Sequence, residues 1–334
     1  MSIQSVASQA GVSVATVSRV FNFPDRVMPA TRARVERVAC ALGYLPNASA
    51  RALRTQRSRI LGVVLPTLLN PTFAECLQGI AKAAAAGDYA IVPVTTGYQL
   101  DEEQRAVQLL LAGNVDGLIL VVSNPATSSA LAHLRQVGVP YVLAYNRHAD
   151  HPCVTVDSEG AVAGAVARLV AFGHRSIAMV SGTLTASDRA QQRYRGFLLG
   201  MADAGLAPQP LLEVPFIETA VEALTHFLRG PQRPTALLCS NDLLAIRCIR
   251  AAHLAGLQVP RDLSVIGFDG IALGEDLTPA LSTVTQPNAD IGRHTVELLV
   301  RALASGAPLT AGTSLLLPHA FRAGESCAAV GSAA

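Results

Sequence analysis

Hydrophobic positions in the first 45 residues recur at the spacing of short, half-buried helices. Between Ile3 and Ala10 they fall at i, i+3, i+4 and i+7, which places them on one helix face, and Gly11 then turns the chain. The same spacing returns at Val35, Val38, Ala39 and Leu42. With the helix expected between them, these segments predict a compact helix-turn-helix unit, although the pattern alone also fits a generic small helical bundle.

The stretch VSVATVSRVF, residues 12–21, predicts a short helix with two different faces. Ser13 is a favourable N-cap, and Val12 outside the cap can pack on Val17 inside it as a hydrophobic staple. One face then carries Val17, Val20 and Phe21, and the other carries Val14, Ala15, Ser18 and Arg19. The second face is free to contact another molecule.

From Ile60 onward, apolar strand patterns alternate with amphipathic helix patterns. The first series predicts strands at ILGVVLP, AIVPV, GLILVV and YVLAY, with helices near 72–86, 102–112 and 127–136 between them. A second series begins with a helix at 158–172 and contains the strands SIAMVS, LLEVP, ALLCS and LSVIGF. This alternation predicts βαβ units in two similar halves, each with a doubly wound parallel sheet.

Charge separates the head from the rest of the chain. Residues 1–59 contain nine arginines and only two carboxylates, Asp25 and Glu36, which gives them a net charge of +7. The whole chain carries +2, so the remaining residues carry −5. A basic head on an acidic body is typical of a nucleic-acid-binding module joined to a unit with another task.

Length and composition indicate how many domains the protein has and in which compartment it works. A chain of 334 residues is too long for one small core, so two or three units are expected. No apolar run approaches the roughly eighteen residues that cross a membrane, and the polar N-terminus has no apolar leader segment, so we expect a cytoplasmic protein without membrane contact. The six cysteines show no matched pairing and are expected as reduced thiols.

Several longer stretches carry a resemblance to a known family. SVASQAGVSVATVSRVFN, the PATRARV run and GYLPNASARALRTQRSRILGVVLP are followed by NPTF, VDGLI, VDSEGA, GHRSIAMVSG, RYRGF, SND, LSVIGFD and LSTVTQP. Each motif alone is weak, but in this order along the whole chain they resemble the lac/galactose repressor family of bacterial transcription regulators. One position departs from the family pattern, because Met28 stands before Pro29 where a Ser or Thr cap is usual. Losing that cap costs about 1 kcal/mol, which the fold should survive.

The resemblance implies three parts in the chain. Residues 1–45 are expected as an all-α helix-turn-helix head, residues 46–58 as a hinge helix that forms on DNA, and residues 59–334 as an α/β core like that of periplasmic sugar-binding proteins. The two core subdomains are expected at about 59–157 plus 286–314, and at about 158–285 plus 315–330. The chain is expected to cross between them near 157–160, 284–288 and 312–320.

The DNA contacts follow from the same resemblance. Leu53 occupies the position of the hinge leucine that enters the minor groove as an apolar wedge and kinks the duplex. The alternative is that Leu53 packs against its dimer mate or its own domain. Arg19 is expected to make the most sequence-specific contact, because a forked donor suits guanine in the major groove. The residues expected at the DNA are Ser5, Val14, Ala15, Thr16, Ser18, Arg19, Asn22, Thr31, Ala50, Leu53 and Arg54.

Candidate ligand-binding residues lie just after the predicted strands, because ligands of open α/β sheets bind at the carboxyl ends of strands. Amides, hydroxyls and a carboxylate suit a small hydroxylated molecule, on whose apolar face Phe73 can stack. By resemblance, Arg193 in RYRGF matches the family's effector-contacting arginine, and Asn241 and Asp269 match other frequent contacts. The expected effector-binding set is Thr67, Asn70, Phe73, Ser123, Asn146, Arg147, Ser181, Arg193, Asn241 and Asp269.

Structural roles compete with these assignments. Asn241 and Asp242 could cap the following helix, and Arg193 could pair with Asp188. If Arg193 does bind the effector, a guanidinium favours a sugar acid, although it can also donate to two hydroxyls of a neutral sugar.

Enzyme chemistry has no positive support in the sequence. There is no G-x-x-x-x-G-K loop, and the only lysine is Lys82, inside a predicted helix. The run HADHPC offers His148, Asp150, His151 and Cys153 as metal ligands, but no second group has matching spacing, so a solvated loop is the preferred interpretation. We therefore expect no catalysis, no metal and no cofactor.

The sequence thus predicts a homodimeric repressor that binds a palindromic double-stranded DNA operator. Its operator affinity is expected to depend on a sugar or sugar acid bound between the core subdomains. A higher coiled-coil assembly is not expected, because the final stretch FRAGESCAAVGSAA has no apolar heptad. The alternative is a small-molecule-binding or transport component that does not bind DNA, against which only residues 1–58 argue. Whether the effector is an inducer or a corepressor is left open, as are its identity and the operator sequence.

Overall fold

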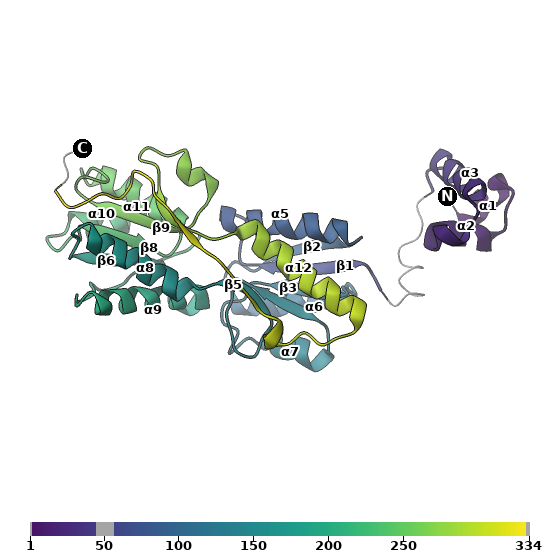
Figure 1. Ribbon diagram of the computed structural model, residues 1–334, viewed down its shortest axis with the longest axis horizontal. Helices are drawn as coiled ribbons and strands as arrows, with labels where there is room; N and C mark the ends of the chain where they lie inside the picture. Colours follow the sequence, from purple (N-terminus) through teal and green to yellow (C-terminus); the bar gives the residue numbers. More distant parts are fainter. Residues whose placement is uncertain (1, 45–56, 332–334) are drawn as a thin grey trace. The chain divides into compact units, whose positions relative to one another are not determined.

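The computed structural model describes residues 2–44 and 57–331, which belong to two compact units divided between Ser58 and Arg59 (Figure 1). Each unit has its own hydrophobic interior. The expected hinge contacts Ala50, Leu53 and Arg54 lie outside the described residues.

The first unit is the three-helix head. Its elements are α1 (Ile3–Ala10), α2 (Val14–Asn22), the short 3-10 helix η1 (Pro24–Arg26) and α3 (Pro29–Ala41). Ser13 caps α2 as predicted, since its hydroxyl accepts the Thr16 N–H at 3.1 Å. Val17 and Val20 are buried against residues of α1 and α3, which confirms the predicted inner face. Helix α3 begins at Pro29 without a side-chain cap, as Met28 implies.

The first half of the second unit, called the N-subdomain below, is built on a six-stranded parallel sheet in the order β11-β5-β4-β3-β1-β2. The alternating pattern from Ile60 onward predicted most of it. Its elements are β1 (Ile60–Leu65), α5 (Pro71–Ala86), β2 (Ala90–Thr95), α6 (Leu100–Ala112), β3 (Gly117–Leu120), α7 (Ser129–Val137), β4 (Tyr141–Ala144), β5 (Cys153–Val156), α12 (Asn288–Ser305), η4 (Ala311–Thr313) and β11 (Leu315–Leu317).

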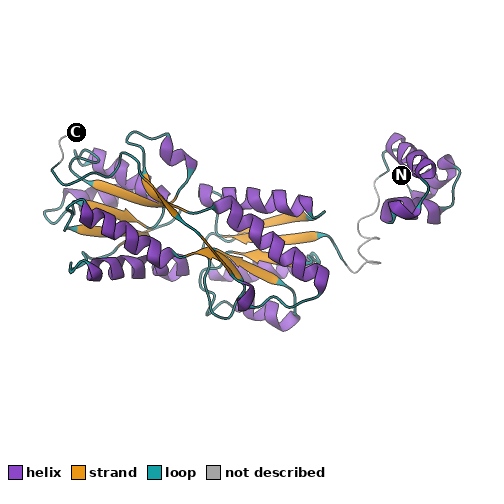
Figure 2. Cartoon of the chain, viewed as in Figure 1, coloured by secondary structure: helices purple, strands orange, loops and turns teal. Residues whose placement is uncertain are grey.

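The other half, the C-subdomain, has a sheet in the order β12-β10-β9-β8-β6-β7, parallel except for the β10–β12 pair. In both sheets, helices cover the two faces (Figure 2). The elements are α8 (Ser158–Ala171), β6 (Ile177–Gly182), η2 (Leu184–Ala186), α9 (Asp188–Asp203), β7 (Leu212–Val214), α10 (Val221–Arg229), β8 (Ala236–Cys239), α11 (Asp242–Leu254), β9 (Ser264–Asp269), η3 (Ala272–Glu275), β10 (Ser282–Thr285) and β12 (Ala320–Arg322).

The chain crosses between the subdomains three times, after β5, after β10 and after β11. The expected boundary at 314/315 is wrong by one strand. Leu315–Leu317 pairs with Val154–Val156 of β5 and so completes the N-subdomain sheet, and only Ala320–Arg322 joins the C-subdomain. The last crossing therefore lies at residues 318–319.

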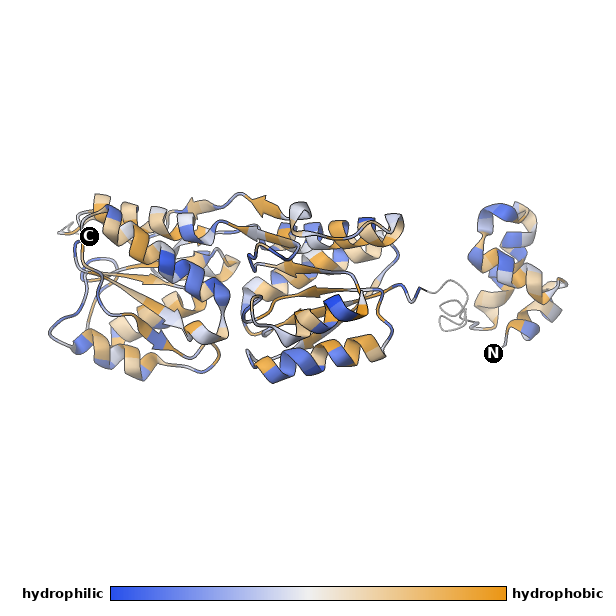
Figure 3. Ribbon diagram, turned by 90° about the horizontal axis from the view of Figure 1, so that it is seen from below, coloured by the Kyte–Doolittle hydropathy of each residue, from blue (hydrophilic) through white to orange (hydrophobic). Residues whose placement is uncertain are grey.

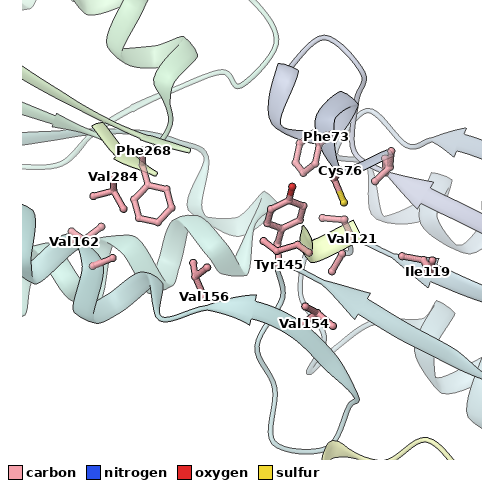
Figure 4. Packing of buried hydrophobic residues seen from close by; sticks show 14 of the residues in the cluster. Phe73, Cys76, Ile119, Val121, Tyr145, Val154, Val156, Val162, Phe268 and Val284 are labelled. Carbon is pink, nitrogen blue, oxygen red and sulfur yellow. The ribbon is translucent and has the colours of Figure 1, made fainter. Parts of the chain in front are cut away.

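Close helix packing brings the late helix α12 into the N-subdomain. A Cβ on Gly79 of α5 would lie 2.0 Å from the Ala289 carbonyl oxygen, so only glycine allows the two helices to approach this closely. In Figure 3 the strands are coloured mostly as hydrophobic, and hydrophilic residues gather on the helices. Figure 4 shows the buried side chains that continue from Ile119 and Val121 to Val162 and Phe268 across the two subdomains.

Candidate functional site

One face of α2 is available for contact with another molecule. Val14, Ala15 and Arg19 are exposed, and Val14 retains 41% of its accessible surface. The remaining polar candidates are half-buried; Thr16, Ser18 and Asn22 belong to α2, Ser5 to α1 and Thr31 to α3. This face therefore combines methyl groups with one long cationic donor.

Three of these polar side chains already have partners in α2 or at its cap, and one such contact is the 3.3 Å hydrogen bond from the Asn22 amide to Ser18 Oγ. The Asn22 amide donates to the Ser18 carbonyl oxygen at 2.5 Å, and Thr16 Oγ1 lies 2.9 Å from Ser13 Oγ. These contacts stiffen the ends of the helix. Arg19, by contrast, extends from an exposed position.

The second site is a cavity between the N-subdomain and the C-subdomain, called the inner cavity below. Its volume is about 20 Å³, so the two subdomains are closed around it. Five of the predicted effector residues line it, namely Asn70, Phe73, Arg193, Asn241 and Asp269. Its other lining residues are Thr72, Tyr98, Tyr145, Ser187, Arg189, Ala190, Phe216, Ser240 and Gln286.

A buried ion pair forms the polar centre of the inner cavity. Arg193 Nη2 of α9 lies 3.3 Å from Asp269 Oδ1 at the end of β9. The same guanidinium donates to the Ser240 carbonyl oxygen and lies 3.7 Å above the Phe268 ring. Burial lowers the pKa of Arg193, and the Asp269 carboxylate opposes that shift. Burial likewise raises the pKa of Asp269, while Arg193 lowers it.

Arg193 does not pair with Asp188, so that alternative is wrong. Asp188 instead contacts the neighbouring Arg189, with 3.1 Å between Nη1 and Oδ1. The Arg193 Nε has no hydrogen-bond partner among the described residues. It is therefore a buried donor that a hydroxylated or anionic ligand could satisfy.

The start of α5 forms the wall of the inner cavity in the N-subdomain. Asn70 caps this helix, since its Oδ1 accepts the Thr72 N–H at 3.2 Å. The Phe73 ring meets the Tyr145 ring edge-on, with centroids 5.7 Å apart (Figure 4). The Tyr145 hydroxyl lies 3.1 Å from the Thr72 carbonyl oxygen and 3.2 Å from Asn288 Oδ1, and so ties α5 to the start of α12.

The capping alternative for Asn241 is confirmed, and the residue also lines the inner cavity. Its Oδ1 accepts the Leu244 N–H at 2.8 Å. Asp242 does not cap in this way. Its carboxylate accepts the backbone N–H groups of Gly270 and Ile271, both at 2.8 Å, and thereby holds the turn that presents Asp269. Burial, together with the nearby Asp269 charge, raises the pKa of Asp242 to about 7.

Five predicted effector residues do not line the inner cavity, namely Thr67, Ser123, Asn146, Arg147 and Ser181. Ser123 is buried and hydrogen-bonded to Glu103, with 2.6 Å between the two oxygens. Arg147 points outward and lies 3.4 Å from Asp157. The Thr67 hydroxyl accepts its neighbour Leu69 N–H at 3.0 Å, and Ser181 is fully buried in β6. A strand end places a residue at the edge of the sheet, but the loop that follows decides where its side chain points.

Asn146 belongs to a polar contact between the subdomains, called the subdomain junction below. Its amide donates to Asp188 Oδ1 at 2.5 Å and to the Val122 carbonyl oxygen at 2.8 Å. Arg189 donates to the same Val122 oxygen at 2.8 Å, and Asp188 N–H donates to the Ser123 carbonyl oxygen at 2.7 Å. Residues at the start of α9 therefore hold the ends of β3 and β4.

Three aromatic residues of the inner cavity were not predicted, namely Tyr98, Tyr145 and Phe216. Tyr98 and Phe216 follow the predicted strands AIVPV and LLEVP, and Tyr145 ends the predicted strand YVLAY, so the strand-end rule could have found them. Gln286 was missed because β10 was not predicted as a strand, although its motif LSTVTQP was noted.

Within residues 2–44 and 57–331, no group of three or more His, Cys, Asp or Glu side chains is placed to hold a metal ion. The His151 ring of the HADHPC loop instead has its Nδ1 2.6 Å from the Tyr141 hydroxyl. None of the described helices has the length and apolar character that spanning a membrane requires.

An exposed helix face on a basic head, together with a polar cavity between two α/β subdomains, defines a ligand-responsive DNA-binding regulator. Comparison with known proteins agrees. The family model "Bacterial regulatory proteins, lacI family" matches residues 2–47, and "Periplasmic binding protein-like domain" matches residues 166–327. Catabolite control protein A of Priestia megaterium is 35% identical over 309 residues, which cover 90% of this chain and 92% of that protein. The chain therefore belongs to the LacI family of bacterial transcription regulators, as the motifs predicted.

Other relatives are regulators as well. The transcriptional repressor CytR of Escherichia coli K12 is 33% identical over 89% of this chain and 88% of its own length. A crystal structure of the lac repressor dimer bound to operator and the anti-inducer ONPF matches with a TM-score of 0.88 and 26% identity, covering 98% of this chain and 99% of that one. These relatives are transcription regulators and not enzymes.

Proposed function

We propose that this protein is a homodimeric, cytoplasmic repressor that binds a palindromic operator through the exposed face of α2 and through the hinge. A two-fold DNA site needs two heads, because one small head buries too little surface for tight binding. The lac repressor structure, which contains a dimer on its operator, supports this arrangement.

We further propose that a sugar or sugar acid in the inner cavity controls operator affinity. The observation that carries this proposal is the buried Arg193–Asp269 pair, which offers one donor group and one acceptor group in the same cavity. A polyhydroxylated ligand can satisfy both, whereas a purely apolar one would leave both charges without new partners. The structure of the similar transcriptional regulator CelR is a complex with cellobiose, which supports a sugar as the ligand class.

The control would act as a coupling free energy. A ligand that contacts both subdomains favours one relative orientation of them, and that orientation determines whether two hinges can pair on DNA. The subdomain junction is positioned to report this orientation, because Asn146 and Asp188 come from different subdomains. The proposal leaves both an inducer and a corepressor possible.

The deciding experiment has two parts. First, the full-length protein selects operator sequences from a random duplex library, and a thermal-shift screen tests sugars, sugar acids and nucleobases. Second, fluorescence anisotropy measures operator affinity with and without each compound that raises the melting temperature. A compound that changes operator affinity at least tenfold supports the proposal. A protein that selects no sequence would support the alternative, a small-molecule-binding component without DNA binding.

The hinge needs its own test. Leu53→Ala is expected to reduce operator affinity and the bend angle of the operator while leaving the melting temperature unchanged. A FRET bending assay that finds the full bend with the variant would show that Leu53 is not the wedge.

A further inference from the structure

The inner cavity is separated from a second hollow, called the outer groove below, by two aromatic residues. The outer groove has a volume of about 610 Å³. It is lined by residues 97–101 of the N-subdomain and by residues 183, 185, 186 and 215–218 of the C-subdomain. Tyr98 and Phe216 line both the inner cavity and the outer groove. They therefore form the wall between the two spaces.

The two rings come from opposite subdomains and lie flat against each other. Their centroids are 4.5 Å apart and their planes differ by 9°. Tyr98 follows β2 in the N-subdomain, and Phe216 follows β7 in the C-subdomain. Stacking of this kind stabilises the pair only modestly beyond the burial of the two rings. A contact of that size can be broken by a ligand and can reform behind it.

Each ring is held in place by its own backbone surroundings. Phe216 packs on Gly182 at the end of β6, where a Cβ would lie 2.2 Å from the ring. Tyr98 has a φ of 63°, which is unfavourable for a side chain of its size and is retained when surrounding structure requires it. Both features place the rings at the boundary between the inner cavity and the outer groove when no ligand is bound.

The two spaces also differ in charge. The inner cavity has two arginines, Arg189 and Arg193, and one carboxylate, Asp269, in its lining, whereas the charged residues that line the outer groove are two carboxylates, Asp101 and Glu218. Tyr98 faces the inner charges, and burial there raises the pKa of its hydroxyl to about 12. The carboxylates of the outer groove therefore repel an anionic group, and the arginines of the inner cavity attract it.

We propose that Tyr98 and Phe216 form a gate through which ligands reach the inner cavity, and that the outer groove is the second part of an extended binding site. The chemical class that fits is a ligand with a flat or apolar-faced ring that can lie between the two side chains. Its anionic or hydroxyl-rich end lies inward at Arg193, and its neutral remainder lies in the outer groove. The ligand class rests on the proposed function, but the gate itself does not.

The gate is tested without any ligand by measuring access to the inner cavity. Ala190 lines this cavity and is 1% exposed, so Ala190→Cys places a thiol behind the gate. The variant is made in a Cys40→Ser background, which removes the exposed native thiol. Mass spectrometry then measures how fast a methanethiosulfonate reagent labels the introduced thiol. Tyr98→Ala is expected to raise this rate at least tenfold, and Tyr98→Phe is expected to leave it unchanged because the ring is retained.

Tyr194→Ala is the matched control. Tyr194 is another half-buried tyrosine that stacks on a phenylalanine, Phe197, but it does not line either hollow. Its substitution should leave the labelling rate of the introduced thiol within twofold of the parent. If Tyr98→Ala also leaves the rate within twofold, or if Tyr194→Ala raises it equally, the gate does not exist.

A second measurement covers the case in which Tyr98→Ala folds poorly. The chain contains no tryptophan, so Phe216→Trp introduces a single fluorophore at the gate. Its acrylamide quenching constant should be low with Tyr98 present and at least double with Tyr98→Leu, which keeps an apolar side chain. Equal quenching in both proteins would overturn the proposal.

The charge order is tested with the same introduced thiol of the Ala190→Cys variant. An anionic sulfonate reagent should label it faster than a cationic trimethylammonium reagent of similar size, after correction for their rates with free cysteine. The opposite order would overturn the inward placement of the anion. None of these rates depends on DNA, so failure of operator binding would contradict the proposed function and leave the gate unaffected.

Discussion

Arg193 and Asp269 form an ion pair of 3.3 Å whose side chains are only 8% and 3% exposed. The pair joins α9 to the end of β9 within the C-subdomain, and both residues line the inner cavity. Because each charge is removed from water, each depends on the other. The pair thus contributes to the fold of the C-subdomain as well as to ligand binding.

Removing one member of this pair should destabilise the protein. Arg193→Met leaves the Asp269 carboxylate buried and without its cation, which typically costs roughly 3–5 kcal/mol. Urea denaturation of the core should show this loss, and the double variant Arg193→Met, Asp269→Asn should recover much of it. If Arg193→Met alone melts like the parent, the pair is not formed in solution.

Arg19→Ala should weaken operator binding by about 1–3 kcal/mol. The reason is that Arg19 is the long exposed donor on a face otherwise made of small side chains. Fluorescence anisotropy should measure the affinity of Arg19→Ala and of the parent for the selected operator and for random duplex DNA. Equal weakening on both DNAs would make Arg19 a phosphate contact instead of a base contact.

Asp242→Asn should change how stability depends on pH. Burial raises the pKa of Asp242 to about 7 from its ordinary 3.8. Between these values the folded state holds a proton that the unfolded state has lost, so this group's contribution to stability declines as pH rises through that window.

Asparagine keeps a similar shape and does not titrate, so the melting temperature of Asp242→Asn relative to the parent should increase from pH 5 to pH 8. The control is Asp262→Asn, a half-buried carboxylate whose pKa is lowered by its hydrogen bond with Arg261. It should show no such gain. A constant difference between Asp242→Asn and the parent would contradict the raised pKa.

Asn146→Ala should loosen the subdomain junction. The substitution removes the contact with Asp188 and two contacts with Val122, and leaving such buried groups unsatisfied costs about 1–3 kcal/mol. Small-angle scattering should report a larger radius of gyration for the variant. The exposed neighbour Arg147→Ala should scatter like the parent. An unchanged radius for Asn146→Ala would show that the junction does not hold the subdomains together.

Met28→Ser should stabilise the head. Helix α3 has no side-chain cap, and Met28 is 75% exposed, so serine loses little packing and gains an acceptor for the Thr31 N–H. An N-cap of this kind contributes about 1 kcal/mol. Hydrogen exchange in the full chain should show slower exchange at Thr31 and no change in α11. Unchanged exchange at Thr31 would mean that the serine does not cap.

Much of the fold was predictable because its elements have strong periodic patterns. The long strands and amphipathic helices from Ile60 to Phe268 follow the expected alternation, and the Ser13 cap lies where the sequence placed it. The short strands β11 and β12 were harder to place. Three residues such as Leu315–Leu317 carry no usable period, and their pairing with β5 depends on a segment about 160 positions earlier.

The candidate site was predictable only in part, for a related reason. Motif resemblance identified Arg193 and Asp269 as residues of interest, but their pairing with each other depends on how α9 meets β9. Ser123 and Asn146 were assigned to the ligand because they are polar and follow strands. Their actual partners, Glu103 and Asp188, come from elements that no local pattern connects to them.

The three crossings between the subdomains affect the order in which the chain can fold during synthesis. The head has its interior within residues 2–44 and can form as soon as it leaves the ribosome. The N-subdomain cannot be completed then, because α12 packs on α5 and β11 pairs with β5. The β5 edge of its sheet therefore stays unpaired until Leu315–Leu317 has been synthesised. A chain stalled on the ribosome before that point would therefore have a folded helix-turn-helix head and an incompletely folded N-subdomain.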